Sequence, residues 1–188
     1  MRFTPPQPPC IRTQGLTLID LILSLAILLI LITLGVPSMR LISAKSLQTT
    51  QVNNFVSHFA LARSLAITRE QHQILCPSTD GKTCLDRADW SKGLIIFEDT
   101  NRNGVQDLNE PLQACHHPAA PSEIEIHSSR NRKRVIYHGD GRPSGYNLTL
   151  TFCDPDERIA PKAVIVNNVG RVRVSDSRPD GSPLRCGE

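Results

Sequence analysis

The chain has few aromatic residues and no recognisable catalytic motif. Phe, Trp and Tyr make up 4% of its 188 residues, which argues against a surface that binds nucleic-acid bases by stacking. Its six histidines belong to no known nucleophile or general-base motif, and there is no glycine-rich phosphate loop. Internal repeats and coiled-coil heptads are also missing. These gaps argue against an enzyme, membrane-anchored or otherwise, and we expect no cofactor.

Charge is nearly balanced over the whole chain but concentrated near its C-terminus. The formal net charge is only +3, a value that by itself identifies no class of partner. Residues 130–188, however, contain 11 Arg or Lys against 7 Asp or Glu, an excess of four. A local excess of this kind favours an anionic partner.

An apolar segment of about 20 residues lies close to the N-terminus. Residues 16–36 are apolar apart from Asp20 and a few Thr, Ser and Gly residues, and a helix needs about 20 such residues to cross a bilayer. A secretory signal has a shorter apolar stretch followed by small residues. Here the small residue, Gly15, comes first. We therefore expect residues 16–36 to form one transmembrane helix.

The polar segment 1–15 has the features of a leader peptide. It is rich in proline and contains two arginines, whose charges favour a cytoplasmic leader with the rest of the chain outside. Asp20 supports this interpretation, because a carboxylate at mid-bilayer costs about 2.5–3.5 kcal/mol and needs a reason. Cleavage after Gly15 would free the amine of Leu16, and such an amine, from the same or a neighbouring chain, could pair with Asp20.

Two further segments complete the expected organisation. In residues 37–72, apolar side chains recur every three or four positions, which predicts an amphipathic helix that continues the first. Residues 73–188 contain short β-prone runs separated by turn signals, namely Gln73–Cys76, Gly93–Phe97, Glu123–His127, Arg134–Tyr137, Asn147–Cys153, Ala163–Asn167 and Arg171–Ser175. The expected fold class is α+β: one long helix, half membrane segment and half spine, packed on an antiparallel β domain.

Several motifs resemble those of a known family. The stretch Gly15-Leu16-Thr17-Leu18-Ile19-Asp20-Leu21 resembles the type IV pilin signature, usually written G-F-T-L-I-E-L, with Leu in place of Phe and Asp in place of Glu. Downstream, Cys76–Cys84, Trp90–Gly104 and Ile165–Val174 resemble the GspH/FimT group of minor pilins and pseudopilins. The resemblance covers nearly all of the chain from Leu16 onward, and it implies a type IV pilin-like fold.

The resemblance also implies a cellular role. In type IV pilins a prepilin peptidase cleaves after the glycine and methylates the new N-terminus, which places processing at Gly15 and Leu16. The acidic residue, here Asp20, helps subunits dock into a filament. We therefore expect assembly with other pilin subunits. The expected location is the bacterial inner membrane, as a single-pass protein with its C-terminal domain in the periplasm, and then the pilus at the cell surface.

The C-terminal arginines are the candidate binding residues. Alternate residues of a strand share a face, so Arg171 and Arg173 are expected to point together, with Val172 and Val174 directed to the core. Gly170 permits a turn before the strand. Two guanidinium groups on one face suit phosphate oxygens, which they contact through forked hydrogen bonds.

The function expected of these arginines again rests on the resemblance. In FimT-like proteins the G-R-x-R motif is implicated in binding DNA during natural transformation. This implies sequence-independent binding of extracellular DNA by a minor pilin, through Gly170, Arg171 and Arg173, aided by Arg130, Arg132, Lys133, Arg134, Arg178 and Arg185. The alternative is a solvated strand face or a contact between subunits. The chain would then be a structural or priming minor pilin, or a type II secretion pseudopilin, without DNA binding.

Residues 99–110 match the spacing of a calcium-binding loop, D-x-[DN]-x-[DN]-G-x5-E. The side chains concerned are Asp99, Asn101, Asn103, Asp107 and Glu110. A predicted strand before the loop and Pro111 after it exclude a helix–loop–helix, and Asn-Gly is a common hairpin turn. We therefore favour a β-hairpin loop over a calcium site and expect no bound metal.

Five of the six cysteines follow the apolar segment, so at least one of these is unpaired within the chain or pairs elsewhere. If this part is exported, disulfides persist there. Cys76 and Cys84 flank a turn and are consistent with a small disulfide loop. Cys153 and Cys186 could tie the C-terminal tail to a strand, as pilins often do, and Cys115 would then be left over. Each bridge would contribute about 2–4 kcal/mol.

Overall fold

The computed structural model describes residues 15, 17–118, 123–143 and 147–187. Leader residues 1–14 and Leu16 lie outside this part, so the predicted cleavage site is described only on its Gly15 side. The chain divides into two compact units, Met1–Arg40 and Leu41–Glu188.

One helix, α1 (Leu18–Arg69), runs from the first unit into the second. At its start, the Asp20 carboxylate accepts hydrogen bonds from the backbone N and Oγ1 of Thr17 (3.1 and 2.7 Å), and Thr17 Oγ1 accepts one from the Asp20 N–H (3.3 Å). This reciprocal pair is a capping box with Asp in place of the usual Glu or Gln. The helix ends before the predicted residue 72, because Glu70 has a positive φ of 55°.

The first part of α1 carries an uncovered apolar surface. Its large apolar side chains between Leu18 and Ile32 are each at least 51% exposed. By length and composition α1 is long and apolar enough to cross a membrane, with a mean hydropathy of 2.8 in its most apolar stretch. An apolar surface of this size requires lipid or other protein subunits to cover it.

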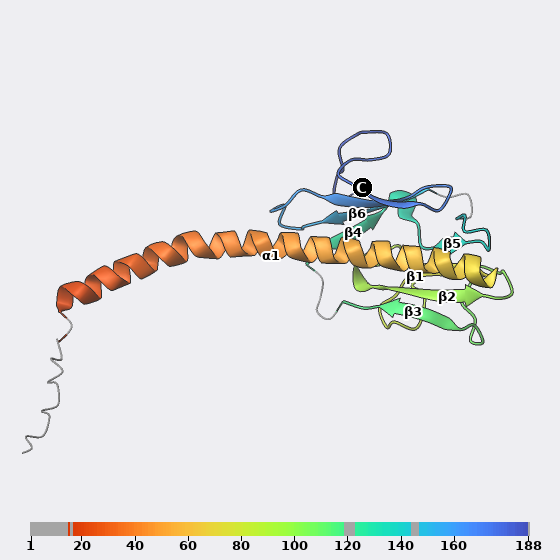
Figure 1. Ribbon diagram of the computed structural model, residues 1–188, viewed down its shortest axis with the longest axis horizontal. Helices are drawn as coiled ribbons and strands as arrows, with labels where there is room; N and C mark the ends of the chain where they lie inside the picture. The colour runs from red at the N-terminus through yellow and green to blue at the C-terminus, as the bar shows by residue number, and fades with distance from the viewer. Residues whose placement is uncertain (1–14, 16, 119–122, 144–146, 188) are drawn as a thin grey trace, which may run out of the picture. The chain divides into compact units, whose positions relative to one another are not determined.

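The second unit contains two four-stranded antiparallel sheets (Figure 1). The first has the order β3-β2-β1-β5, formed by Leu112–His116, Leu94–Asp99, His72–Pro77 and Val135–Tyr137. The second has the order β4-β6-β7-β8, formed by Glu125–Ser128, Leu148–Cys153, Lys162–Val166 and Val172–Ser175. Two 3-10 turns, η1 (Trp90–Lys92) and η2 (Ser129–Asn131), complete the unit.

The second part of α1 packs against both sheets and forms the core with them. Its buried stripe is Val52, Phe55, Phe59, Ala62 and Ala66, and these residues share one cluster with apolar side chains from β1, β2, β4, β5, β6 and β7. Every buried apolar side chain of the described residues lies between 44 and 184. The unit Leu41–Glu188 therefore contains a complete hydrophobic core and should fold without the membrane segment.

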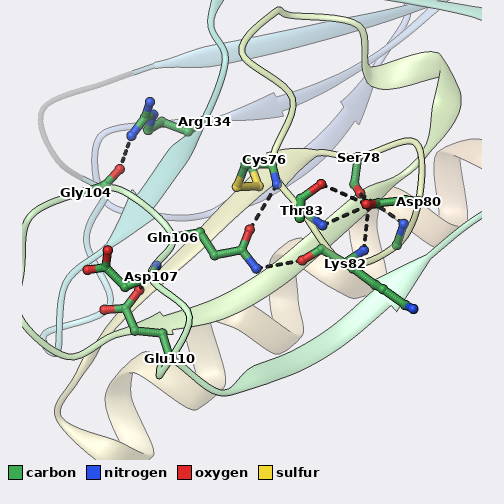
Figure 2. The surroundings of a disulfide bond; sticks show 12 residues. Cys76, Ser78, Asp80, Lys82, Thr83, Gly104, Gln106, Asp107, Glu110 and Arg134 are labelled. Carbon is green, nitrogen blue, oxygen red and sulfur yellow. Dashed lines mark hydrogen bonds between the residues drawn. A yellow bond between two sulfur atoms is a disulfide. The ribbon is translucent and has the colours of Figure 1, made fainter.

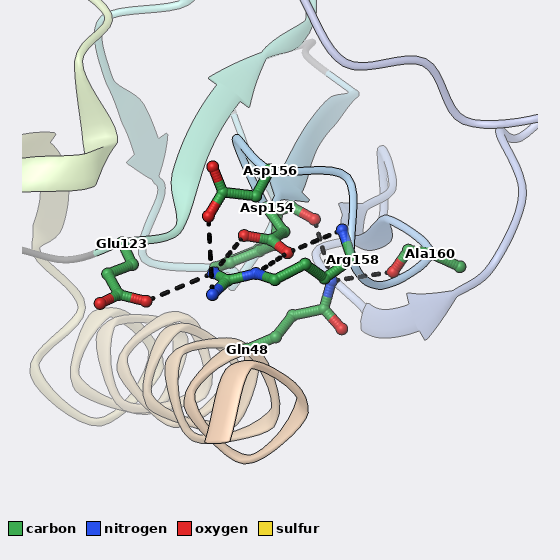
Figure 3. A network of polar contacts seen from close by, with 7 residues as sticks. Gln48, Glu123, Asp154, Asp156, Arg158 and Ala160 are labelled. Atoms are coloured by element: carbon green, nitrogen blue, oxygen red, sulfur yellow. Dashed lines mark hydrogen bonds and ion pairs between the residues drawn. The ribbon is translucent and has the colours of Figure 1, made fainter. Parts of the chain in front are cut away.

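Polar contacts fix the helix to the loop after β6 (Figure 3). The buried amide of Gln48 donates hydrogen bonds to the backbone oxygens of Phe152 (3.1 Å) and Ala160 (3.0 Å). In the same loop, Arg158 Nη2 lies 2.7 Å from the buried carboxylate of Asp154. Hydrogen bonds from Arg158 hold the pKa of Asp154 below its ordinary value. The loop is thereby kept in one conformation against the helix.

All seven predicted strands are present, with ends that differ by at most two residues, and the α+β prediction is confirmed. An eighth strand, β3, was not predicted. It is an edge strand whose residues are exposed or half-buried, so its sequence lacks the apolar alternation of a covered strand.

The prediction that the side chain of Val174 is directed to the core was wrong, because this side chain is not buried. Val174 pairs with the buried Val164, but β8 is the edge of the sheet and Val174 is 45% exposed.

Candidate nucleic-acid interface

The second sheet has one face in the core and one face turned away from it. Along β6, Leu148, Leu150 and Phe152 are buried in the core cluster. Thr149 and Thr151 alternate with them, so they lie on the outer face. His127 of β4 pairs with Thr151 in register and shares that face. The outer face of this sheet is therefore polar where the inner face is apolar.

A hollow of about 570 Å³ lies over this outer face. The strands contribute His127, Thr149 and Thr151. Residues of the turn around η2 line one side of the hollow, and residues of the C-terminal tail line another. The lining residues from these loops and their neighbours are Ser129, Arg130, Arg132, Asn147, Asn168, Arg178, Pro179, Asp180 and Arg185.

The tail is held over the sheet by a disulfide and a small apolar contact. Cys186 bonds to Cys153 at the end of β6. Leu184 packs on Ala163 and Ile165 of β7, which are buried on the outer side of the sheet. These contacts keep Arg185, and the segment that carries Arg178, beside the threonines of β6.

The hollow is basic. Among the described residues that line it, four are arginines and one, Asp180, is acidic. Asp180 is hydrogen-bonded by the N–H and hydroxyl of Ser182, which lowers its pKa and keeps it ionised. Within the described residues, the guanidinium of Arg130 has no ion-pair partner, and its side chain is exposed. A phosphate group would find several guanidinium and hydroxyl donors here.

The predicted G-R-x-R residues lie at the edge of the same sheet, outside the hollow. Arg173 pairs with Ile165 in register, so it shares the outer face with the hollow. Arg171 instead lines a shallow groove between α1 and the start of β8. Both side chains are exposed. Gly170 has a φ of +79°, and a Cβ there would lie 2.2 Å from the Gly141 carbonyl oxygen, so the turn before β8 requires glycine.

The predicted cluster at residues 130–134 is divided between the two sheets. The chain passes from β4 through η2 to β5, so Arg130 and Arg132 stay by the second sheet and Lys133 and Arg134 reach the first. Lys133 pairs with Asp86 at 2.9 Å. Arg134 donates to the Gly104 carbonyl oxygen (Figure 2). These two residues stabilise loops of the first sheet, and neither lines the hollow.

The loop 100–111 connects β2 and β3, so the hairpin interpretation is confirmed. The buried Asp99 carboxylate accepts from the backbone N–H groups of Asn103 and Gly104 (3.1 and 2.9 Å). Glu110 accepts from the N–H groups of Thr100 and Asp107. Across the described residues, no group of three or more His, Cys, Asp and Glu side chains is arranged to hold a metal ion.

Both predicted disulfides are formed. Cys76–Cys84 closes the loop before η1, and Gln106 joins this loop to the β2–β3 hairpin by accepting from Cys84 N and donating to Lys82 O (Figure 2). Cys153–Cys186 holds the tail. Cys115 is free and exposed, as expected.

Sequence reasoning missed the polar side chains that line the hollow. They are His127, Ser129, Asn147, Thr149, Thr151 and Asn168. One signal was available, because Leu148-Thr149-Leu150-Thr151-Phe152 alternates strictly between apolar and hydroxyl side chains, which indicates a strand with a polar outer face.

Comparison with models of known protein families identifies the family of this chain. The model of the family described as type II transport protein GspH matches residues 51–170, more than half of the chain. The chain belongs to the GspH family. The match ends at Gly170, so the arginines of β8 and the tail lie beyond it.

Two solved structures align with this GspH-family chain. The type IV minor pilin FimU of Pseudomonas aeruginosa PAO1 aligns with a TM-score of 0.56 at 13% identity, over 70% of this chain and 90% of FimU. The minor pseudopilin EpsH of the Vibrio cholerae type II secretion system aligns with a TM-score of 0.48 at 13% identity, over 75% of this chain and 97% of EpsH. At 13% identity the similarity to FimU concerns the fold alone. No curated protein sequence matches the chain.

Proposed function

We propose that this GspH-family chain is a minor pilin that binds DNA without sequence preference and serves DNA uptake in natural transformation. In this proposal a prepilin peptidase removes residues 1–15 and methylates Leu16. The protein is held in the inner membrane by α1 with its second unit in the periplasm. It then joins other pilin subunits in a pilus.

The observation that carries the proposal is the basic outer face of the second sheet. Arg130, Arg132, Arg178 and Arg185 line the hollow, and Arg173 lies on the same face at the sheet edge. Contacts with backbone phosphates come mainly from Arg and Lys and contain no sequence information. The described residues that line the hollow are mostly polar and include no Phe, Tyr or Trp, which fits contact with phosphates rather than stacking on bases.

The test is a DNA-binding titration of the fragment Leu41–Glu188 with a 30-bp duplex, followed by fluorescence anisotropy at several salt concentrations. We expect binding that weakens as salt rises, because each neutralised phosphate contributes a slope of about −0.9 in log K against log[salt]. Arg130→Gln/Arg173→Gln removes two exposed arginines of this face. It should weaken binding about tenfold, since a hydrogen bond to a charged group contributes about 1.5–3 kcal/mol.

The matched control removes two positive charges elsewhere. Lys82 and Arg87 are exposed and lie in loops of the first sheet. Lys82→Gln/Arg87→Gln should bind the duplex as the unchanged fragment does. If the fragment binds no DNA at low salt, or if the control variant loses as much affinity as the arginine variant, DNA binding through this face is wrong.

A second candidate is a structural or priming subunit without DNA binding, in a pilus or in a type II secretion pseudopilus. The matching family description, type II transport protein GspH, favours this candidate. It predicts that deletion of the protein abolishes filament assembly or secretion, and that the basic face contacts a neighbouring subunit. The titration separates the two, because only the first candidate predicts salt-dependent DNA binding.

A further inference from the structure

The residues that line the hollow over the second sheet differ in exposure. Arg130 and Arg185 are exposed, and they lie on the loops that border it. Thr149 and Thr151 are half-buried on the strand beneath. A ligand that stays outside contacts the arginines alone, whereas one that enters also meets the two hydroxyl groups.

The volume of the hollow limits the size of the ligand that it can bind. Its volume of about 570 Å³ is within the range of about 300–1,000 Å³ that is usual for small-molecule sites. A DNA duplex is much too broad for such a site, since its major groove alone is about 12 Å wide. A duplex phosphate would therefore reach the bordering arginines but leave the threonines untouched. One or two unpaired nucleotides have the dimensions of a small-molecule ligand.

We propose that this hollow binds an unpaired segment of a DNA strand, with a backbone phosphate between the bordering arginines and the hydroxyl groups of Thr149 and Thr151. The inference rests on the proposed DNA-binding function and adds to it a preference for single-stranded over double-stranded DNA at this site. Arginine forks and hydroxyl groups both donate to phosphate oxygens. Among the described residues, no Phe, Tyr or Trp lines the hollow, and His127 is its one ring. Contacts with the phosphate backbone therefore dominate, and such contacts are independent of sequence.

The test compares two probes on the fragment Leu41–Glu188. One is a four-nucleotide oligothymidylate, and the other is a blunt 30-bp duplex without terminal phosphates. The variant is Thr149→Val/Thr151→Val, which keeps the β-branched shape and removes only the hydroxyl groups. We expect the affinity for the short strand to fall about tenfold, because two phosphate hydrogen bonds are lost. The affinity for the duplex should change by less than about twofold.

Two controls keep the result interpretable. Thr149→Ser/Thr151→Ser retains both hydroxyl groups and should bind the short strand like the unchanged fragment. Arg171→Gln/Arg173→Gln removes charge outside the hollow and should weaken duplex binding more than short-strand binding. Thermal unfolding of each variant establishes that it is folded before its affinity is compared.

Each outcome has a defined meaning. If the valine variant binds the short strand normally while duplex binding persists, the inference is wrong and the proposed function stands. If both probes lose affinity equally, the hollow does not discriminate and the inference is also wrong. If inorganic phosphate shifts the amide resonances of Thr149 and Thr151 but the short strand does not, the hollow is a site for free phosphate. If neither DNA probe binds the unchanged fragment, the proposed function itself fails.

Discussion

His72, the first residue of β1, contacts His138, which directly follows β5, and this contact affects protonation. His72 Nε2 and His138 Nδ1 lie 3.0 Å apart, so one ring nitrogen donates a hydrogen bond to the other. That bond requires one ring to present an unprotonated nitrogen. Burial, followed by the charges of His138 and Arg102, lowers the pKa of His72, while Asp99 acts in the opposite direction. The folded state therefore favours neutral His72.

This contact predicts a pH dependence of stability between about pH 5 and 7. The unfolded chain protonates His72 near its ordinary pKa of 6.5, above the pKa in the folded state. Over that interval the unfolded state binds more protons, so the free energy of unfolding falls as pH decreases. Urea unfolding of Leu41–Glu188 from pH 5 to 8 should show a lower midpoint at acid pH.

The substitution His72→Gln isolates the contribution of this pair. Gln cannot be protonated in this range, so the midpoint of the variant should vary less between pH 5 and 7. A variant whose midpoint falls with pH as steeply as the unchanged fragment would contradict this role of His72. His127→Gln provides a matched control, because His127 lies on β4 of the second sheet, whereas the His72–His138 contact lies beside β1 and β5 of the first.

At the scale of elements, the C-terminal tail is the segment whose position matters most for the candidate site. It follows the edge strand β8 and is held by the Cys153–Cys186 bond and by Leu184. The bond closes a loop with a sequence separation of 33 residues. Without it the tail would be held by the Leu184 contact and its own hydrogen bonds, so we expect Arg185 to be placed less firmly over the hollow.

Removal of this disulfide should therefore weaken both stability and ligand binding. For Cys153→Ser/Cys186→Ser we expect the free energy of unfolding to fall by about 2–4 kcal/mol, measured by urea denaturation. The affinity for the short DNA strand should fall as well, measured by anisotropy at a temperature where the variant is folded. Cys76→Ser/Cys84→Ser is the matched control, since that bond lies by the first sheet and should affect stability alone. Equal losses of affinity in the two variants would contradict the role of the tail.

For the whole molecule, the residue that we expect to control filament assembly is Asp20, near the start of α1. In the unprocessed chain its carboxylate accepts from Thr17 and caps the helix. After cleavage we expect it to pair with a terminal amine of the same or a neighbouring chain. The helix cap requires only an acceptor oxygen, whereas pairing with an ammonium group requires the negative charge.

Three substitutions of Asp20 separate capping from assembly. Asp20→Glu should preserve or improve filament yield, and Asp20→Ala should reduce it. Asp20→Asn keeps an acceptor for the cap but removes the charge, so it should reduce the yield as Ala does. The measurement is the amount of the protein in sheared filaments, with its mass determined to establish that residues 1–15 have been removed. Normal assembly of the Ala or Asn variant would argue against the charge pairing.

The long helix, seven of the eight strands and the Cys76–Cys84 bond were predictable because each rests on a local pattern, whereas the Cys153–Cys186 pairing rested on the resemblance to pilins. Apolar spacing gave the helix stripe that includes Phe55 and Phe59, and the alternation of residues 147–153 gave β6. The strand β3 was missed because an edge strand needs no apolar alternation. The exposure of Val174 was missed for a related reason, since its strand has the expected pattern but no neighbouring strand on one side.

The candidate site was predictable only in part. The sequence shows that positive charge is concentrated after residue 130, but it does not show which arginines share a surface. Lys133 and Arg134 follow Arg132 directly, yet the chain crosses between sheets at that point and takes them to Asp86 and Gly104. Proximity in sequence is therefore a poor guide wherever a segment connects two layers.

The sequence by itself determined that the chain has a long N-terminal helix with an apolar segment fit to cross a membrane, followed by an antiparallel β domain in an α+β fold. Helical periodicity, segment length and motif spacing are local properties, so they can be read along the chain. Only the tertiary structure decided that Arg130, Arg178 and Arg185 meet over Thr149 and Thr151 in one hollow. These residues come from separate strands and loops, and strand pairing together with the Cys153–Cys186 bond brings them together.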